Sequence, residues 1–232
     1  MKRFVFVIIV IAVLTTFSCS RPIQPTSDFI LVKSGELVLP KYFDVVEKII
    51  FEDAESIRLT EFIDSTITIY PQLYAYRIIG ADGYYPALKG VPDNIWEQMS
   101  YGYLKIEIKK VVFDPILNLP GKYNVKDMET IQLLRKIDTK LASTDSSIFL
   151  LVDSLSGGQD TISLVRFIEP FTTTPQNYSY KLIGVDGTER LFSWAEIQTG
   201  RWVISQDLTR FNPDLGSSSH IFHLKMIELN QL

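Results

Sequence analysis

The chain has 232 residues, of which 46% are hydrophobic, 12% aromatic and 22% charged. This balance is typical of a globular protein and excludes a disordered one. The formal net charge is −4, and an acidic chain without a basic run is a poor candidate for binding nucleic acid or an anionic membrane surface. The chain has one cysteine, so disulfides within the chain and metal sites built from several thiolates are excluded.

The amino terminus has the organisation of a secretion signal. Lys2 and Arg3 precede an unbroken apolar run at residues 4–14, and Cys19 follows shortly after it. A helix that spans a bilayer needs about 20 apolar residues, so this run is too short to be one. It is typical of the apolar part of a signal peptide.

The cysteine has the position of a bacterial lipidation site. Ser18 is the small residue expected before such a cysteine, whereas Thr16 and Phe17 depart from the usual lipobox. We expect residues 1–18 to be a lipoprotein signal peptide and Cys19 to carry the lipid. The alternative is an uncleaved or ordinarily cleaved secretory signal in which Cys19 has no role.

An internal repeat follows. Residues 71–83 (PQLYAYRIIGADG) and 175–187 (PQNYSYKLIGVDG) are identical at eight of thirteen positions. Residues 57–63 match 162–168 upstream of these segments. Further downstream, the matched positions are Trp96 and Trp194, Gly102 and Gly200, Phe113 and Phe211, and the apolar sets Ile131, Leu134, Ile137 and Ile221, Leu224, Ile227. Five ordered blocks indicate a tandem duplication of a domain of roughly 90–110 residues.

Short apolar patterns predict the first elements of each copy. Leu59, Phe62 and Ile63 have the spacing of one helical turn, and residues 164–168 repeat it. Residues 74–79 alternate as a strand does. Asp82-Gly83 and its counterpart Asp186-Gly187 then predict a turn that ends each strand.

The later part of each copy predicts a short helix and further strands. Ser193 and Glu196 form a capping box, and Gly200 would end that helix. In the first copy we assign these roles to Asn94, Glu97 and Gly102. The expected strands are residues 105–113, 125–137 and 221–229.

The sequence therefore predicts an α+β protein made of two tandem repeats of a small mixed-sheet domain, after a cleaved signal peptide. The expected organisation is a tether at 19–27, a first domain at 28–139, a polar linker at 140–147 and a second domain at 148–232.

These blocks resemble the molybdopterin-binding domain of sulfite-oxidase-type oxidoreductases and its small non-catalytic relatives. In that family a helix of the pattern V-x-L-x-x-L-L precedes a strand that ends in G-A-D-G-Y. Residues 57–63 correspond to the first pattern, residues 79–84 to the second and residues 125–137 to the closing strand. The second copy keeps Gly-Val-Asp-Gly at 184–187 but has Thr188 in place of the tyrosine. The resemblance covers most of residues 45–232.

The catalytic members of that family bind molybdenum through a cysteine thiolate. This chain has no cysteine after Cys19 and no histidine in the first copy, so the resemblance implies the fold and not the redox chemistry. We assign no catalytic residue, no metal ligand and no cofactor. Asp82 and Tyr84, on a rim, and Arg77 and Arg135, as phosphate-binding arginines, would be the cofactor-binding candidates if a cleft for molybdopterin were retained.

Other motifs have simpler interpretations. Residues 155–159 spell the ABC-ATPase signature LSGGQ, but no phosphate-binding P-loop accompanies it, so Gly157-Gly158 is interpreted as a surface turn. His220 and His223 would point to opposite faces of a strand. Their expected counterparts in the first copy, Thr130 and Leu133, do not bind metal, so the sequence predicts no repeated metal site. Trp96 and Trp194 are expected to pack in the core.

The sequence favours a lipid-anchored protein of the bacterial cell envelope, with the outer membrane facing the periplasm as its expected location because Ser20, and no acidic cluster, follows Cys19. The favoured function is a non-catalytic binding or assembly module with a protein partner, which predicts exposed apolar surface at the seam or at the rim of a sheet. The alternatives are a periplasmic oxidoreductase or redox accessory that holds a pterin-type cofactor in an arginine-lined cleft, and a receptor for a small ligand between the copies.

Overall fold

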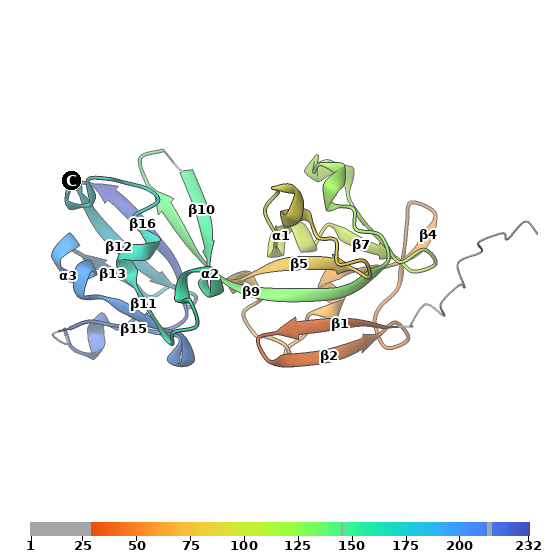
Figure 1. The fold of residues 1–232 in the computed structure, drawn as a ribbon, viewed down its shortest axis with the longest axis horizontal. Helices are drawn as coiled ribbons and strands as arrows, with labels where there is room; N and C mark the ends of the chain where they lie inside the picture. Colours follow the sequence, from red (N-terminus) through yellow and green to blue (C-terminus); the bar gives the residue numbers. More distant parts are fainter. Residues whose placement is uncertain (1–28, 145, 213–214) are drawn as a thin grey trace, which may run out of the picture.

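The structure is a computed structural model that describes residues 29–144, 146–212 and 215–232 (Figure 1). The expected signal peptide, Cys19 and the tether lie outside these residues. The described part is mixed and rich in sheet, with 43% strand and 22% helix, which fits the α+β class. Within it, no helix is long and apolar enough to cross a membrane.

Sixteen strands are present in the described residues. They are β1 (Phe29–Ser34), β2 (Leu37–Tyr42), β3 (Ile49–Phe51), β4 (Ala54–Arg58), β5 (Tyr74–Gly80), β6 (Asn94–Ile95), β7 (Gly102–Lys105), β8 (Lys110–Phe113), β9 (Met128–Leu141), β10 (Ser146–Leu151), β11 (Thr161–Ser163), β12 (Tyr178–Gly184), β13 (Glu189–Phe192), β14 (Arg201–Val203), β15 (Leu208–Arg210) and β16 (Leu224–Gln231).

The helices are short. Three of those in the described residues are α-helices: α1 (Trp96–Met99), α2 (Val152–Ser156) and α3 (Trp194–Thr199). The others are single 3₁₀ turns, namely η1 (Leu59–Phe62), η2 (Pro71–Leu73), η3 (Pro86–Lys89), η4 (Pro115–Leu117), η5 (Gly121–Tyr123), η6 (Leu164–Phe167), η7 (Pro175–Asn177), η8 (Ile204–Gln206) and η9 (Ser217–Ser219).

Strand β9 joins the two ends of the molecule (Figure 1). Its first part pairs parallel with β1 and antiparallel with β5. Its last part pairs parallel with β16 and antiparallel with β10. One 14-residue strand thus belongs to two sets of neighbours within a nine-stranded sheet. We call residues 29–135 the first half and residues 136–232 the second half.

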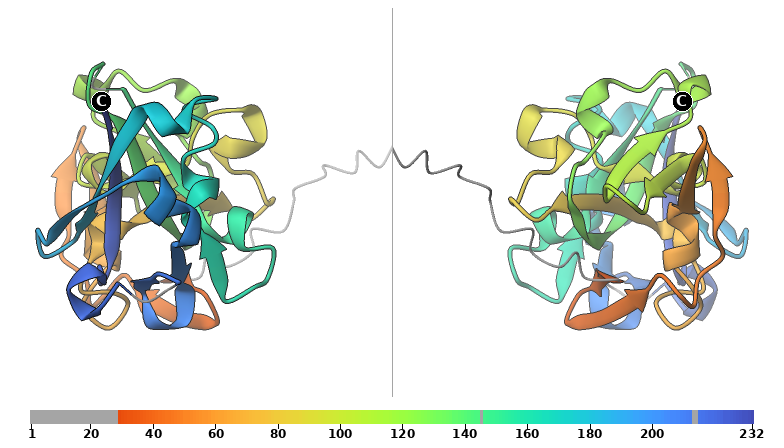
Figure 2. Two further views of the ribbon diagram at one scale, coloured as in Figure 1. Left: turned by 90° about the vertical axis from the view of Figure 1, so that its left-hand side faces the viewer. Right: turned by 90° about the vertical axis from the view of Figure 1, so that its right-hand side faces the viewer.

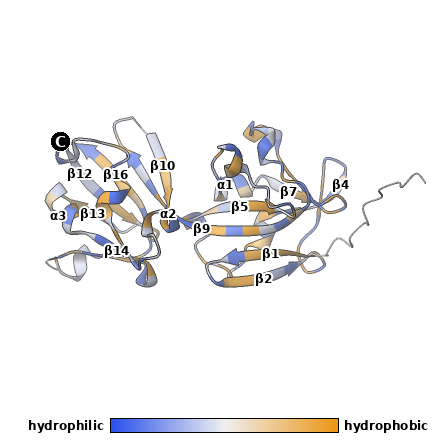
Figure 3. Ribbon diagram, viewed as in Figure 1, coloured by the Kyte–Doolittle hydropathy of each residue, from blue (hydrophilic) through white to orange (hydrophobic). Residues whose placement is uncertain are grey.

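Each half has its own apolar core. Ile131 and Leu133 of β9 pack in the first core, whereas Ile137 packs in the second. The chain therefore passes from one core to the other inside β9, while residues 140–147, expected as a linker, lie in the β9–β10 hairpin. Their polarity has a local reason, because residues 142–144 and 146–148 at the tip of this hairpin are exposed; Figure 3 shows the hydropathy along the chain. The views in Figure 2 show the second half from one end and the first half from the other.

Several predicted elements are confirmed. The strand predicted at 74–79 is β5, and the turns of η1 and η6 bury their leucine and phenylalanine. Both turns are 3₁₀ and not α-helical. The capping box of α3 is also present, since Ser193 Oγ accepts the N–H of Glu196 and Glu196 Oε2 accepts the N–H of Ser193 at 2.7 Å. Gly200 follows the helix as predicted.

The cap assigned to the first half is wrong by one residue. The residue before α1 is Ile95, and its N–H is accepted by the side chain of Gln98 at 3.0 Å. Asn94 instead lies buried in β6 and donates its side-chain amide to the carbonyl of Tyr76. Ile95 has no polar side chain that could signal a cap, so the sequence pattern predicted the cap at the nearby polar residues Asn94 and Glu97.

The expected match between the closing strands is also wrong, by six residues. Ile78 pairs with Ile131 in the first half, and the equivalent Leu182 pairs with Ile227 in the second. The counterpart of Ile131 is therefore Ile227 and not Ile221. Both strands are apolar over most of their length, so their hydrophobic patterns superpose at more than one offset and only the hydrogen-bonded register decides between them.

This shift changes the counterparts of the two histidines. Asp127 and His223 both have positive φ, 47° and 49°, and their carbonyls accept the N–H groups of Ala81 and Val185. His223 thus corresponds to Asp127 and not to Leu133, and His220 corresponds to Asn124 and not to Thr130. The strand expected at 105–113 is likewise two strands, β7 and β8, because the chain turns at Lys109 with φ 46°.

The LSGGQ segment is a turn in the structure. Gly157 and Gly158 follow α2 with φ of 57° and 84°. In the first half, Glu52 and Asp53 make the turn between β3 and β4 with φ of 47° and 60°. The second half uses glycine where the first half holds two ordinary side chains in the left-handed region, which is costly for residues other than glycine.

Asp53→Gly is therefore expected to raise the free energy of unfolding by about 0.5 kcal/mol, because the strain removed exceeds the flexibility gained in the unfolded chain. Gly158→Ala is expected to lower it by about 1 kcal/mol. Urea denaturation of both variants measures the two effects. A destabilised Asp53→Gly protein would contradict the assignment of strain to this turn.

An ion pair holds β2 against the segment after η1. Lys41 Nζ lies 2.5 Å from Asp64 Oδ2, and this hydrogen bond, with further ones from Thr66, lowers the pKa of Asp64 to about 2. The pKa of an aspartate in the unfolded chain is about 3.9. The stability that this ion pair contributes is therefore fully present above that pH, and it is lost as the pH falls through the pKa of Asp64 in the folded protein.

We expect the stability difference between the wild-type protein and Asp64→Asn to shrink as the pH is lowered from 5 to 2. Since the carboxylate is half exposed, the difference at neutral pH should be below about 1 kcal/mol. Denaturant titrations at several pH values measure it. Lys41→Met should reduce the same pH dependence, since only the hydrogen bonds from Thr66 then remain, and a difference that persists unchanged at pH 2 would contradict this explanation.

Candidate functional site

The structure places Arg77 in an internal ion pair. Its Nε and Nη2 bind the two carboxylate oxygens of Asp93 at 3.0 and 2.8 Å, and its guanidinium lies 4.5 Å from the ring centroid of Tyr85. The Asp93 side chain is 4% exposed, and its hydrogen bonds raise the pKa of Arg77. The planar guanidinium of Arg77 thus already forms a bidentate ion pair with a carboxylate of the protein.

Asp82 and Tyr84 belong to the turn after β5. Asp82 Oδ1 accepts the N–H of Tyr84 at 2.9 Å, and Tyr84 Oη donates to the carbonyl of Lys122 at 2.7 Å. The second half repeats the turn, where Asp186 Oδ1 accepts the N–H of Thr188 at 2.9 Å. That hydrogen bond is the main reason why the pKa of Asp186 is lowered. These aspartates set the shape of the turn, as the sequence predicted.

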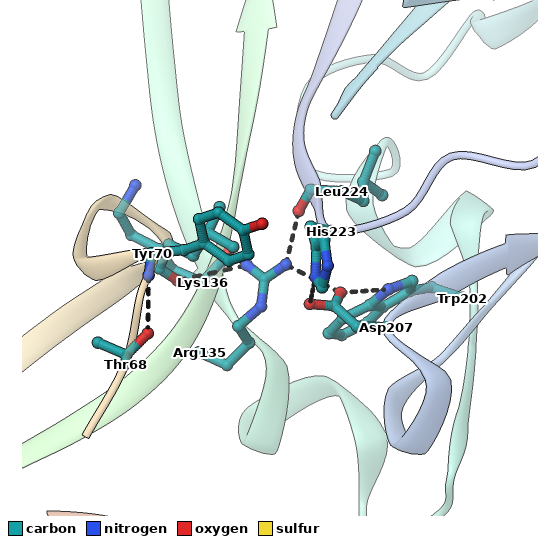
Figure 4. Close-up of polar contacts among 9 residues, drawn as sticks. Thr68, Tyr70, Arg135, Lys136, Trp202, Asp207, His223 and Leu224 are labelled. Carbon is teal, nitrogen blue, oxygen red and sulfur yellow. Dashed lines mark hydrogen bonds and ion pairs between the residues drawn. The ribbon is translucent and has the colours of Figure 1, made fainter. Parts of the chain in front are cut away.

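Arg135 lies at the seam between the halves (Figure 4). Its Nη2 donates to Asp207 Oδ1 at 3.1 Å and to the carbonyl of Leu224 at 2.8 Å, both in the second half. Its Nη1 donates to the carbonyl of Leu73 in the first half at 3.3 Å and to the carbonyl of Lys136. The four cofactor-binding candidates therefore do not form one site, and each has an internal structural role.

Further side chains complete this seam cluster (Figure 4). Asp207 also accepts from Trp202 Nε1 at 3.2 Å and lies 2.9 Å from His223 Nδ1. The His223 ring in turn lies 4.8 Å from the ring of Tyr70, which belongs to the first half. His223 thus joins the two halves. Among the described residues, no group of three or more His, Cys, Asp or Glu is arranged to hold a metal ion.

Two polar clefts lie along the seam. One, of about 370 Å³, is lined by Arg135, Trp202 and Asp207 together with Tyr74 and Asp153. The other, of about 460 Å³, has three lysines and two carboxylates in its wall; these are Lys136, Lys140, Lys225, Glu97 and Asp138. Lys136 is bound by both oxygens of Asp138, at 2.8 and 2.7 Å. Arg135 in the first cleft and Lys136 in the second are thus each paired with a carboxylate of the protein.

The apolar candidate lies at the far end of the second half. A groove of about 570 Å³ runs beside the end of β13, and its lining carries no charged side chain: Gln176, Tyr178, Ser179, Leu191, Phe192, Ser193, Trp194, Ala195 and Leu232. Leu191 is 70% exposed and Leu232 is 82% exposed. On its other side, Trp194 lines a second hollow of about 400 Å³. An exposed apolar groove of this kind is typical of a binding surface.

Strand β13 is also a free edge. Among the described strands it pairs only with β12. Its counterpart in the first half, β6, has two residues and follows Pro92, and its Asn94 side chain turns inward to Tyr76. Natural sheets protect their edges with short strands and prolines. The first half follows this rule at β6, whereas the second half presents a longer edge with an exposed leucine.

The sequence analysis did not identify Leu191 or the groove. The residues that face outward on β13 have no apolar alternation of their own, since Glu189 and Arg190 precede Leu191. The available signal was the difference between the repeats at this position, where Asn94-Ile95 of the first is replaced by Phe192-Ser193 of the second. Trp96 and Trp194 both pack partly against their cores, as expected, but Trp194 also forms the wall of the groove.

Comparison of the chain with protein-family models, with curated proteins and with solved structures finds no match.

Proposed function

We propose that this protein is an envelope lipoprotein, anchored through a lipid on Cys19, that acts as a non-catalytic binding or assembly module. Its two halves would be tandem repeats of a domain resembling the molybdopterin-binding domain of sulfite-oxidase-type enzymes. Its partner would be another envelope protein, with the outer membrane facing the periplasm as the location.

Matched local geometry supports the duplication. Tyr76 Oη donates to the carbonyl of Pro71 at 2.7 Å, and Tyr180 Oη donates to that of Pro175 at 2.5 Å. Each tyrosine also meets a tryptophan at the start of an α-helix, with centroid distances of 5.7 and 5.8 Å and interplanar angles of 41° and 42°. Burial raises the pKa of both tyrosines, that of Tyr180 to about 12. Two such clusters at equivalent points favour a common origin.

The observation that carries the binding function is the groove beside the free edge of β13, whose lining side chains carry no charge. It combines exposed apolar area with a strand that pairs only with β12 among the described strands, and both features expose surface that a soluble monomer normally hides. Strand β13 and helix α3, which line the groove, lie at the end of the molecule opposite β1 (Figure 1). A partner could therefore reach it without approaching the anchor.

Photo-crosslinking in intact cells tests the proposal. We would place p-benzoylphenylalanine at Leu191 and, as the control, at Ile116, which is 75% exposed in the first half. We expect a discrete adduct with one envelope protein from position 191 and none from position 116. Adducts at neither position would contradict a binding role for this edge. Mass spectrometry of the membrane-extracted protein, with Cys19→Ser as the control, tests the lipid anchor separately.

The alternative function, a redox accessory with a pterin-type cofactor, rests on the cleft lined by Arg135. It predicts molybdenum or fluorescent pterin in the protein purified from a host that makes the cofactor. Near-stoichiometric amounts would replace our proposal with this alternative.

A further inference from the structure

We infer that β13 receives an extended segment of a partner protein as an additional antiparallel strand, with a bulky uncharged apolar side chain of that segment in the groove beside Trp194. This inference rests on the proposed binding function and specifies its chemistry. The partner is recognised by main-chain hydrogen bonds and by one apolar anchor.

The outward main-chain groups of β13 have the orientation that an added strand requires. The N–H of Gly184 donates to the carbonyl of Thr188 at 2.8 Å, and antiparallel pairs alternate between bonded and non-bonded residues. Counting along the register, Arg190 and Phe192 form the bonded pairs with Leu182 and Tyr180. The N–H and C=O of Leu191 consequently point away from β12, toward the free side.

The neighbouring residue has the same orientation. The carbonyl of Glu189 faces the free side as well, and it is bound by Arg190 Nη1 at 2.7 Å. A side chain thus occupies a position where another strand would normally donate. Such an exposed ladder is the feature that strand addition uses in peptide recognition.

The charges beside the edge determine the chemistry of the added strand. Arg190 Nε donates to the carbonyl of Ser218 at 2.6 Å, and Glu189 lies 3.7 Å from Lys181 Nζ. Because these charges already have partners and no side chain of the groove lining is charged, a charged anchor would lose hydration without gaining a side-chain counter-ion. The groove therefore favours an uncharged apolar side chain.

The protein's own tether is a poor occupant. Nine residues separate Cys19 from Phe29, which span at most about 32 Å at ~3.6 Å per residue. Strand β9 alone has 14 residues, about 46 Å at ~3.3 Å per residue, and β13 and α3, which line the groove, lie at the far end of the molecule from β1 (Figure 1). A lipidated chain would have to cross that whole length.

A second copy is also disfavoured. Two β13 strands related by a twofold axis can pair Glu189 with Leu191, which sets Arg190 opposite its own copy, and like charges directly opposite are destabilising. The other register pairs Leu191 with Leu191 and sets Glu189 opposite Ser193. The N–H of Ser193 is taken by Glu196 at 2.7 Å and its carbonyl by Ile197 at 3.1 Å. Self-pairing would thus form one bonded pair, whereas a foreign strand can pair with Leu191 and, once its N–H replaces Arg190 at the Glu189 carbonyl, with Glu189 as well.

Peptide selection with an exchange measurement tests this. The full-length lipoprotein in lipid nanodiscs is used to select from a phage-displayed random heptapeptide library, and the selected peptide is made with blocked ends. We expect apolar residues at alternate positions, one peptide per protein, and at least tenfold slower hydrogen exchange of the Leu191 amide when the peptide is bound. Leu191→Pro, which removes that N–H, should weaken binding at least tenfold, whereas Leu191→Val should keep it within about threefold.

Three outcomes overturn the inference. One is a bound peptide that leaves exchange at Leu191 unchanged, and another is equal affinity for Leu191→Pro. The third is a disulfide-linked dimer of Leu191→Cys that forms without peptide and blocks selection, which would make a second copy the occupant. The exchange measurement uses the wild-type protein, so it stands even if the proline variant misfolds. A cellular crosslink at position 191 without amide protection would retain the binding function and reject strand addition.

Discussion

Replacing Arg135 with methionine is expected to lower the free energy of unfolding by about 3 kcal/mol. The substitution keeps the apolar stem but leaves Asp207 without its cationic partner and the carbonyls of Leu73 and Leu224 without their donor. The Arg135 side chain is 12% exposed and that of Asp207 25%, so water replaces little of what is lost. Urea denaturation of residues 20–232 measures the change in the free energy of unfolding.

Lys105→Met is the matched control. Lys105 Nζ lies 2.8 Å from Glu52 Oε2, but the carboxylate side chain is 49% exposed, so its loss should cost less than about 1 kcal/mol. A double-mutant cycle with Asp207→Asn then isolates the contact itself. If Arg135→Met costs no more than Lys105→Met, the seam cluster does not hold the halves together.

The seam also shows which features the sequence could predict. The strand at β5, the turn at Asp82-Gly83 and the capping box at Ser193 follow from signals within a few residues, and all three are present in the structure. The role of Arg135 depends on Asp207, which is 72 residues away. No local pattern relates the two residues, so the arginine could only be proposed as a phosphate ligand.

The boundary between the two halves could not be predicted from the sequence for a similar reason. The sequence predicts a linker in the polar stretch at 140–147, yet Lys140 lies within β9, next to the fully buried Thr139. Strand β9 runs without interruption through the boundary, so no loop or turn marks it. The continuity of β9 therefore removes the signal that a domain boundary normally gives.

Gly80→Ala and Gly184→Ala are expected to destabilise the protein by similar amounts, about 2–3 kcal/mol each. A Cβ at Gly80 would lie 2.7 Å from the carbonyl oxygen of Lys126, and one at Gly184 would lie 2.9 Å from that of Phe222. The main chain that leads into β9 or β16 would have to move in either case. Thermal or urea denaturation measures both effects.

Gly121→Ala is the control, because a Cβ there meets nothing within 4 Å and the position has no positive φ. It should be neutral or stabilising by about 0.5 kcal/mol. Together, the Gly80 and Gly184 variants test more than the steric crowding at each position. If the two glycines occupy the same point of one duplicated turn, the two costs should agree within about 1 kcal/mol, since each Cβ meets one carbonyl and one aspartate oxygen of the same turn. A large cost at one glycine and none at the other would mean that the two turns are held by different contacts, and the structural equivalence of the two halves would then fail at the segment where their sequences agree best.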